Sequence, residues 1–139
     1  MTPRRALLLS LFLALSAAAA DAQTNGTESE AVVSAPASTG LDLYRQQYCG
    51  LCHALDRAET AGIFGPTHNQ LVSVAEQRLQ DEGYKGKAKT VEEYIRESIT
   101  DPNVYLVPGF ETTVHRMPAY THLSPEAVDA IVIFLIQEE

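Results

Sequence analysis

Both cysteines of this 139-residue chain fall within one pentapeptide, Cys49-Gly50-Leu51-Cys52-His53. A C-x-x-C-H sequence is the attachment signature of c-type haem. Two thiols three positions apart on a helical turn can reach the two vinyl groups of one porphyrin, and the adjacent imidazole then points at the iron from the same side. The motif therefore predicts one covalently attached haem c, anchored through Cys49 and Cys52, with His53 as an axial ligand of the iron.

Three other uses of the motif fit less well. A thioredoxin-like dithiol needs a preceding strand in a βαβ context, whereas the approach here is helical and rich in tyrosine. A structural zinc site needs four ligands, and no second Cys or His pair follows at zinc-finger spacing. A structural disulfide is disfavoured because the C-x-x-C loop is so short. Haem attachment is the interpretation that the motif favours.

The N-terminus predicts export. Arg4 and Arg5 precede an apolar run from Ala6 to Ala20, and Ala20-Asp21-Ala22 then offers the small-x-small pattern of a cleavage site, so residues 1–22 are predicted to be a signal peptide. The run is shorter than the roughly 20 residues that a helix needs to span a bilayer. A membrane tether through an uncleaved N-terminus stays open as an alternative. Export agrees with the haem motif, because haem c is attached outside the cytoplasm.

The next segment, residues 23–40, is rich in Ser, Thr, Ala and Gly, and Val32 and Val33 are its only larger aliphatic residues. Such a composition buries too little apolar area to offset the entropy lost on ordering, which predicts a flexible linker. Residues 41–139 remain as one small domain.

Apolar residues in that domain recur at helical spacing, and no convincing strand is visible, which predicts an all-α fold. Thr90 and Glu93 are spaced as a capping box. Ser124 is suited to be an N-cap, with Pro125 at the first helical position. Ile133 is expected to face outward. The expected helices span residues 41–48, 69–79, 90–100 and 125–136.

Few residues can fill the sixth position of the iron. Met117 is the only methionine left once Met1 leaves with the signal peptide, and it lies among loops rich in Pro and Gly. Ligation by histidine and methionine raises the reduction potential, and it leaves no open position for a substrate. This favours electron transfer rather than an enzyme. His68, His115 and His122 are the rivals; we expect His68 at the start of a helix and the other two in partly exposed loops.

With these residues in view, the chain resembles the class I monohaem cytochromes c from Leu41 to Glu139. The resemblance rests on the haem motif, on Gly65-Pro66, on Met117-Pro118-Ala119-Tyr120 and on the closing helix from Leu123 to Ile136. It implies four to five short helices wrapped around one haem.

The same resemblance implies roles for further residues. The carbonyl of Pro66 would accept a hydrogen bond from Nδ1–H of His53 and so orient this ligand. Tyr44 and Phe134 would be the aromatic pair where the first and last helices cross.

Residues 91–110, followed by Met117-Pro118-Ala119-Tyr120, look most like cytochrome c domains of membrane respiratory complexes. This implies a one-electron carrier of a respiratory or photosynthetic chain, in the periplasm or at the extracytoplasmic face of the membrane. Its partners would be redox proteins, a membrane respiratory complex foremost. Two alternatives stay open: a tightly bound electron-transfer subunit of a larger oxidoreductase, and a haem sensor or peroxidase with a labile sixth ligand.

The formal net charge of −8 argues against nucleic acid as a partner, because a nucleic-acid binder needs a clustered basic surface. All three lysines, Lys85, Lys87 and Lys89, lie in one loop. Such a cluster predicts either a solvated loop or a basic spot that helps to orient an acidic protein for docking.

Overall fold

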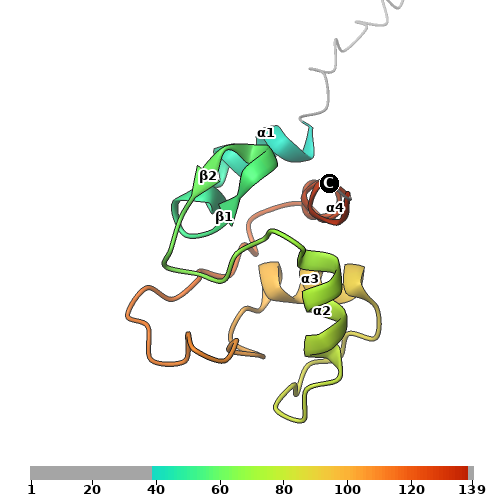
Figure 1. Cartoon of the computed structure of the whole chain (residues 1–139). Coiled ribbons are helices and arrows are strands. Elements are labelled where there is room, and N and C mark those ends of the chain that lie inside the picture. The colour runs from blue at the N-terminus through green and yellow to red at the C-terminus, as the bar shows by residue number, and fades with distance from the viewer. Residues whose placement is uncertain (1–38, 138–139) are drawn as a thin grey trace, which may run out of the picture. The chain divides into compact units, whose positions relative to one another are not determined.

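The computed structural model describes residues 39–137, so the predicted signal peptide and all but the last two residues of the predicted linker lie outside the described residues. Within that range the domain is mostly helical, as predicted, with four α-helices and one small hairpin (Figure 1). The elements in chain order are α1 (Gly40–Gln46), β1 (Ala54–Leu55), β2 (Thr60–Ala61), α2 (Leu71–Leu79), α3 (Val91–Thr100) and α4 (Pro125–Ile136).

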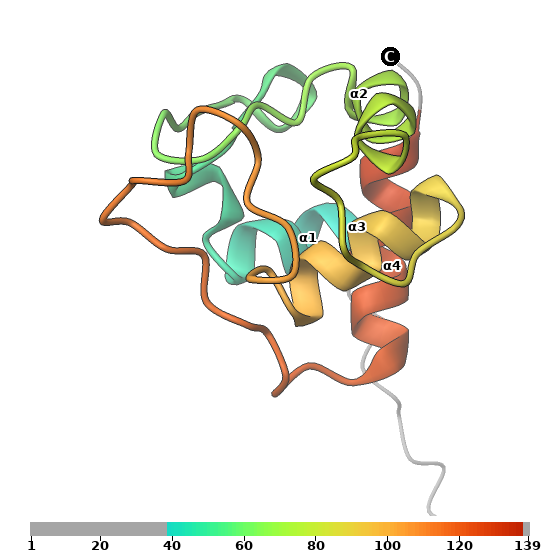
Figure 2. The ribbon, with the colours of Figure 1, turned by 90° about the horizontal axis from the view of Figure 1, so that it is seen from below.

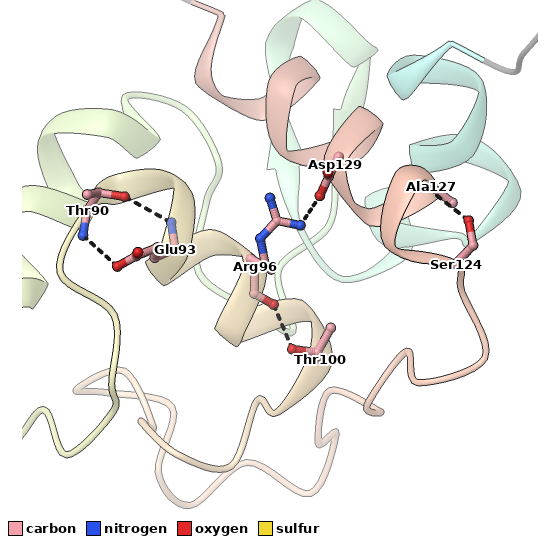
Figure 3. A network of polar contacts seen from close by, with 7 residues as sticks. All are labelled: Thr90, Glu93, Arg96, Thr100, Ser124, Ala127 and Asp129. Carbon is pink, nitrogen blue, oxygen red and sulfur yellow. Dashed lines mark hydrogen bonds and ion pairs between the residues drawn. The ribbon is translucent and has the colours of Figure 1, made fainter.

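The helix starts follow the capping chemistry of the sequence. The predicted box at α3 is confirmed: the Thr90 hydroxyl accepts from the Glu93 amide, and the Glu93 carboxylate accepts from the Thr90 amide. The predicted cap of α4 is also confirmed, because Ser124 Oγ accepts from the Ala127 amide (Figure 3). A second capping box, at Thr39, starts α1 at Gly40, so the last two residues of the predicted linker belong to the folded domain.

Two expected helix boundaries differ. The first helix ends at Gln46 rather than at Tyr48, which takes a left-handed conformation with φ of 57°. Helix α2 begins at Leu71 rather than at Asn69. The Asn69 side chain accepts a hydrogen bond from the Asp56 amide, and the backbone of Gln70 takes a left-handed conformation that does not continue a helix. Both boundaries depend on contacts with other parts of the chain.

The hairpin corrects the prediction that the domain has no strands. β1 and β2 pair antiparallel, Ala54 with Ala61 and Leu55 with Thr60, directly after the cysteine motif. Strands of two residues are too short to show the alternation by which a strand is recognised in a sequence. The Thr60 hydroxyl donates to the His53 carbonyl at 2.9 Å, which joins the hairpin to the end of the motif.

The core is built on α4, against which α1 and α3 pack, with α2 beside α3. The predicted aromatic pair is present: Tyr44 is fully buried, and its ring centroid lies 5.6 Å from that of Phe134. The predicted apolar face of α4 is buried, whereas Ile133 points outward with 56% of its surface exposed. Arg96 and Asp129 form an ion pair between α3 and α4 (Figure 3). None of the described helices is long and apolar enough to cross a membrane.

The segment from residue 101 to 123 contains no helix or strand and runs as a long loop from α3 to α4 (Figure 2). Tyr120 fixes its far end. The Tyr120 amide donates to the Ile99 carbonyl at 3.0 Å, and its hydroxyl donates to the Gln47 carbonyl at 3.1 Å. The loop that carries Met117 is therefore tied to the ends of α3 and α1.

Candidate functional site

One large cavity opens beside the cysteine motif. Cys49, Cys52 and His53 line it on one side, and Met117 lines it from the 101–123 loop. Its empty space, including the solvent at its mouth, is about 1210 Å³. The helices contribute an apolar floor from Tyr94, Ile95, Ile99, Ile131 and Leu135. All four residues predicted as haem anchors and iron ligands thus line the same cavity.

The motif itself is one tight turn. The left-handed backbone of Tyr48 lies between α1 and a 3₁₀ turn formed by Cys49–Leu51. The amides of Cys52 and His53 both donate to the Cys49 carbonyl, at 3.1 and 3.0 Å. Both cysteines are free and half-buried. The turn brings two thiols and one imidazole to the wall of a single cavity, as attachment to one flat cofactor requires.

The His53 imidazole is held in a defined state. Only 7% of the residue is exposed, and its Nδ1 donates to the Pro66 carbonyl at 2.6 Å, the contact that the family resemblance implies. Because a carbonyl can only accept, the proton is on Nδ1, and Nε2 has no hydrogen-bond partner within residues 39–137. Burial, opposed by the Pro66 bond, lowers the pKa of His53. A neutral ring with a free Nε2 is the form that ligates metals.

Gly65 lets the chain pass directly against this ring. A Cβ at Gly65 would lie 2.5 Å from Cε1 and 2.8 Å from Nδ1 of His53. No larger residue fits there unless the imidazole moves. The Gly65 amide also donates to the Cys52 carbonyl at 2.9 Å, which holds the Gly65-Pro66 segment against the motif.

The thiols are poorly suited to dithiol redox chemistry. Burial raises the pKa of Cys49 to about 11, so this thiol is protonated at neutral pH. Reactive C-x-x-C dithiols depend on a lowered thiol pKa. Nor do residues 39–137 bring together any three His, Cys, Asp or Glu side chains as a metal site. The described residues therefore offer no zinc cluster of the usual kind.

Met117 is half-buried and packs against the core from the loop. Its neighbours Arg116 and Pro118 are exposed, so the thioether is the part of this turn that reaches inward. Because Met117 and His53 line the same cavity from different segments, the two side chains could act on one bound group.

Two of the three rival histidines are exposed, as predicted. His115 contacts Phe64 with ring centroids 4.4 Å apart, and loops 62–66 and 110–116 lie side by side there (Figures 1 and 2). His122 Nε2 lies 3.1 Å from Oε1 of Gln47. Although His115 lines the cavity, Met117 is the more buried of the two.

His68 is not where the sequence placed it. Rather than simply leading into α2, its ring stacks on that of His53, with centroids 4.0 Å apart and planes 12° apart. No porphyrin fits between two rings at that distance, so His68 cannot ligate the iron opposite His53. Sequence reasoning missed this contact, because no local pattern reports which ring a loop residue meets.

The three lysines are exposed on the loop before α3. The amides of Lys87 and Lys89 donate to the carboxylates of Glu97 and Glu93, at 2.8 and 2.7 Å. The backbone of this loop is thereby tied to α3, while the lysine side chains reach solvent. Either predicted use, a solvated loop or a docking spot, is compatible with this placement.

The donor set fits a c-type haem: two thiols and a histidine on one turn, a thioether in the opposite loop, and an apolar cavity between them. Comparison of the chain with protein-family models, with curated proteins and with solved structures found no match.

Proposed function

We propose that this chain is an exported monohaem c-type cytochrome with the class I fold, which carries one electron at a time and catalyses no reaction of its own. One haem c would be attached through Cys49 and Cys52. His53 and Met117 would be its axial ligands, and Pro66 would orient His53. We place the protein in the periplasm or at the extracytoplasmic face of the membrane.

One observation carries the proposal: the His53 imidazole is buried and neutral, bonds through Nδ1 to the Pro66 carbonyl, and shares one cavity with both thiols. When bound, haem supplies an iron that takes up and releases one electron. The protein holds the imidazole in one tautomer, excludes water with apolar side chains and offers the thioether of Met117, which favours the ferrous state.

The surface near the motif suits association with another protein. Large apolar side chains are exposed on the motif turn and on the two neighbouring loops: Tyr48, Leu51, Ile63, Phe64 and Val114. We propose redox proteins as partners, a membrane respiratory complex foremost. Electron transfer needs a partner to approach the haem closely, and exposed apolar groups beside the cysteine motif would exclude water from such a contact.

A second candidate function is a permanent electron-transfer subunit of a larger oxidoreductase. Ile133 on α4 favours it, because this apolar side chain is exposed on the core helix without a partner in the described residues. A protein that stays bound to its complex in high salt and is released only by detergent would support this candidate over a diffusing carrier.

An optical spectrum tests the proposed function. The chain is exported in a host that attaches haem c, and the oxidised and reduced spectra are recorded with the protein mass. We expect one covalent haem, a c-type α-band and the weak far-red band of iron–methionine ligation. Met117→Ala should lose the far-red band and keep the haem. Val114→Ala, an exposed change in the same loop, is the matched control and should keep both.

Two outcomes would contradict the proposal. A protein without covalent haem after export with the attachment system overturns it altogether. Covalent haem without the far-red band, combined with rapid binding of carbon monoxide or cyanide by the untreated protein, would replace the carrier by the sensor or peroxidase alternative.

A further inference from the structure

Hydrogen bonds of the surrounding segment hold the backbone of His68 in place, independently of the contact between its ring and His53. Its amide donates to the Ala54 carbonyl at 2.8 Å, and the Thr67 hydroxyl donates to the same carbonyl at 3.1 Å. The Asn69 side chain accepts from the Asp56 amide at 2.9 Å. The segment from Thr67 to Asn69 is therefore docked onto the hairpin that follows the cysteine motif.

The ring of His68 is fixed by Tyr44. The Tyr44 hydroxyl lies 3.3 Å from Nδ1 of His68 and 3.5 Å from the His53 carbonyl. Nδ1 of His68 is the nearer of the two acceptors, and its lone pair can accept from this fully buried hydroxyl. The two rings also meet edge-on, with centroids 5.8 Å apart.

The two imidazoles lie nearly parallel, with ring centroids 4.0 Å apart and planes 12° apart. The His68 ring therefore covers one face of the His53 ring.

His53 thus has three supports: the Pro66 carbonyl, the Gly65 backbone and the His68 ring. The bond to Pro66 fixes the direction of Nδ1–H but leaves the ring free to tilt about that bond. A flat ring stacked on His53 removes this freedom. Partners behind a metal-binding histidine fix both its tautomer and its ring orientation.

We propose that His68, held by Tyr44, is a positioning residue that fixes the plane of the His53 imidazole relative to the haem. This inference rests on the proposed function. In the ferric protein the plane of an axial imidazole contributes to how unpaired spin spreads over the porphyrin. His68 would act on the haem through the His53 ring on which it stacks. An aliphatic residue could fill the same volume, but it would neither lie flat on His53 nor bond to Tyr44.

The test uses the haem-loaded protein and two variants. His68→Leu removes the stacked ring, and Tyr44→Phe removes only the hydroxyl that holds it, keeping the contact with Phe134. The matched control is His122→Leu, at an exposed histidine whose Nε2 lies 3.1 Å from Oε1 of Gln47 and which makes no hydrogen bond or ring contact with His53 within residues 39–137. The readouts are the proton resonances of the haem methyl groups in the ferric protein and the reduction potential.

We expect His68→Leu to change the order or spread of the haem-methyl resonances and to shift the potential. Tyr44→Phe should change the same resonances to a smaller extent, and His122→Leu should leave them as in the wild type. If the first variant fails to fold, the second still decides.

If the variants that fold keep the wild-type resonances and potential, the inference is overturned. The proposed function is judged separately, because the covalent haem and the far-red band are recorded on the same samples. A wild-type protein without haem overturns both. Resonances that move equally in His122→Leu would also overturn it, since that change reports a general response to losing a histidine.

Discussion

The two walls of the cavity are built differently. The His53 wall, residues 49–68, contains the 3₁₀ turns Cys49–Leu51 and Asp56–Ala58 and the hairpin. Backbone hydrogen bonds such as Gly65 to Cys52 and His68 to Ala54 cross-link it. The Met117 wall, residues 101–123, has no regular structure and is fastened to the helices chiefly through Tyr120. One wall is rigid through its own contacts, and the other is positioned by its attachments.

This difference has a functional consequence. The imidazole of His53 is oriented by the protein alone, whereas the thioether of Met117 depends on how the loop closes. In the proposed cytochrome, changes to the first wall should disturb both folding and the haem, and changes to the second should act mainly on the sixth ligand. Substitutions at matched positions of the two walls test this difference.

The largest effect is expected for Gly65→Ala on the His53 wall. The new Cβ would lie 2.5 Å from the His53 ring, so the buried imidazole must move away from the Pro66 carbonyl. Overpacking of this kind lowers the free energy of unfolding by about 2–3 kcal/mol. Urea unfolding measures the loss, and the haem spectrum should change with it. A variant as stable as the wild type would show that the His53 ring can move at little cost in free energy.

The next effect is expected for Tyr120→Phe on the Met117 wall. The variant loses the hydrogen bond from the hydroxyl to the Gln47 carbonyl, a neutral bond worth about 1 kcal/mol. We expect a weaker far-red band with the covalent haem intact. Tyr48→Phe, which removes an exposed hydroxyl, is the control and should change neither quantity. A far-red band of full strength in Tyr120→Phe would mean that the loop closes without this attachment.

The sequence predicted features that carry a local signal and contacts that the family resemblance implies. The starts of α3 and α4 were predictable, because Thr90 with Glu93, and Ser124 with Pro125, carry local capping signals. The pairing of Tyr44 with Phe134 and the bond from His53 to Pro66 came from the resemblance, and the structure contains both contacts. The two helix starts thus follow from spacing along the chain, whereas the two tertiary contacts came only from the resemblance.

Other features had no local signal. The strands Ala54–Leu55 and Thr60–Ala61 are too short to be recognised, and they form because they pair with each other. The stack of His68 on His53 depends on the docking of one loop onto that hairpin. Likewise, the path of the 101–123 loop is set by tertiary bonds to α1 and α3, which composition does not reveal.

A smaller effect is expected for Gly109→Ala, the counterpart of Gly65→Ala on the Met117 wall. A Cβ there would meet nothing within 4 Å, so only the backbone opposes the change, through a φ of 92° that suits glycine. Since alanine also restricts the unfolded chain, the net loss of stability should be about 0.5–1 kcal/mol. A loss as large as that of Gly65→Ala in the same urea experiment would remove the distinction between the walls.

The smallest effect concerns Tyr105, which ties the Met117 wall to the loop before α3 by donating to Asp81 Oδ2 at 3.0 Å. Burial, and after it the Asp81 carboxylate, raises the pKa of Tyr105 from 10 to about 12. The folded protein therefore keeps this proton at a pH where the unfolded chain has lost it. The resulting stability is complete below about pH 10 and is lost as the pH rises through about 12.

Tyr105→Phe has no such proton to lose. Between about pH 10 and about pH 12 its free energy of unfolding should fall less steeply than that of the wild type. Part of the slope should persist, because Tyr44 and Tyr84 also have a pKa raised to about 12. The effect is small because Tyr105 is only half-buried and water screens its interaction with Asp81. If the free energy of unfolding of the variant depends on pH as steeply as that of the wild type, Asp81 does not hold the Met117 wall. Tyr120 would then be the main attachment of this wall.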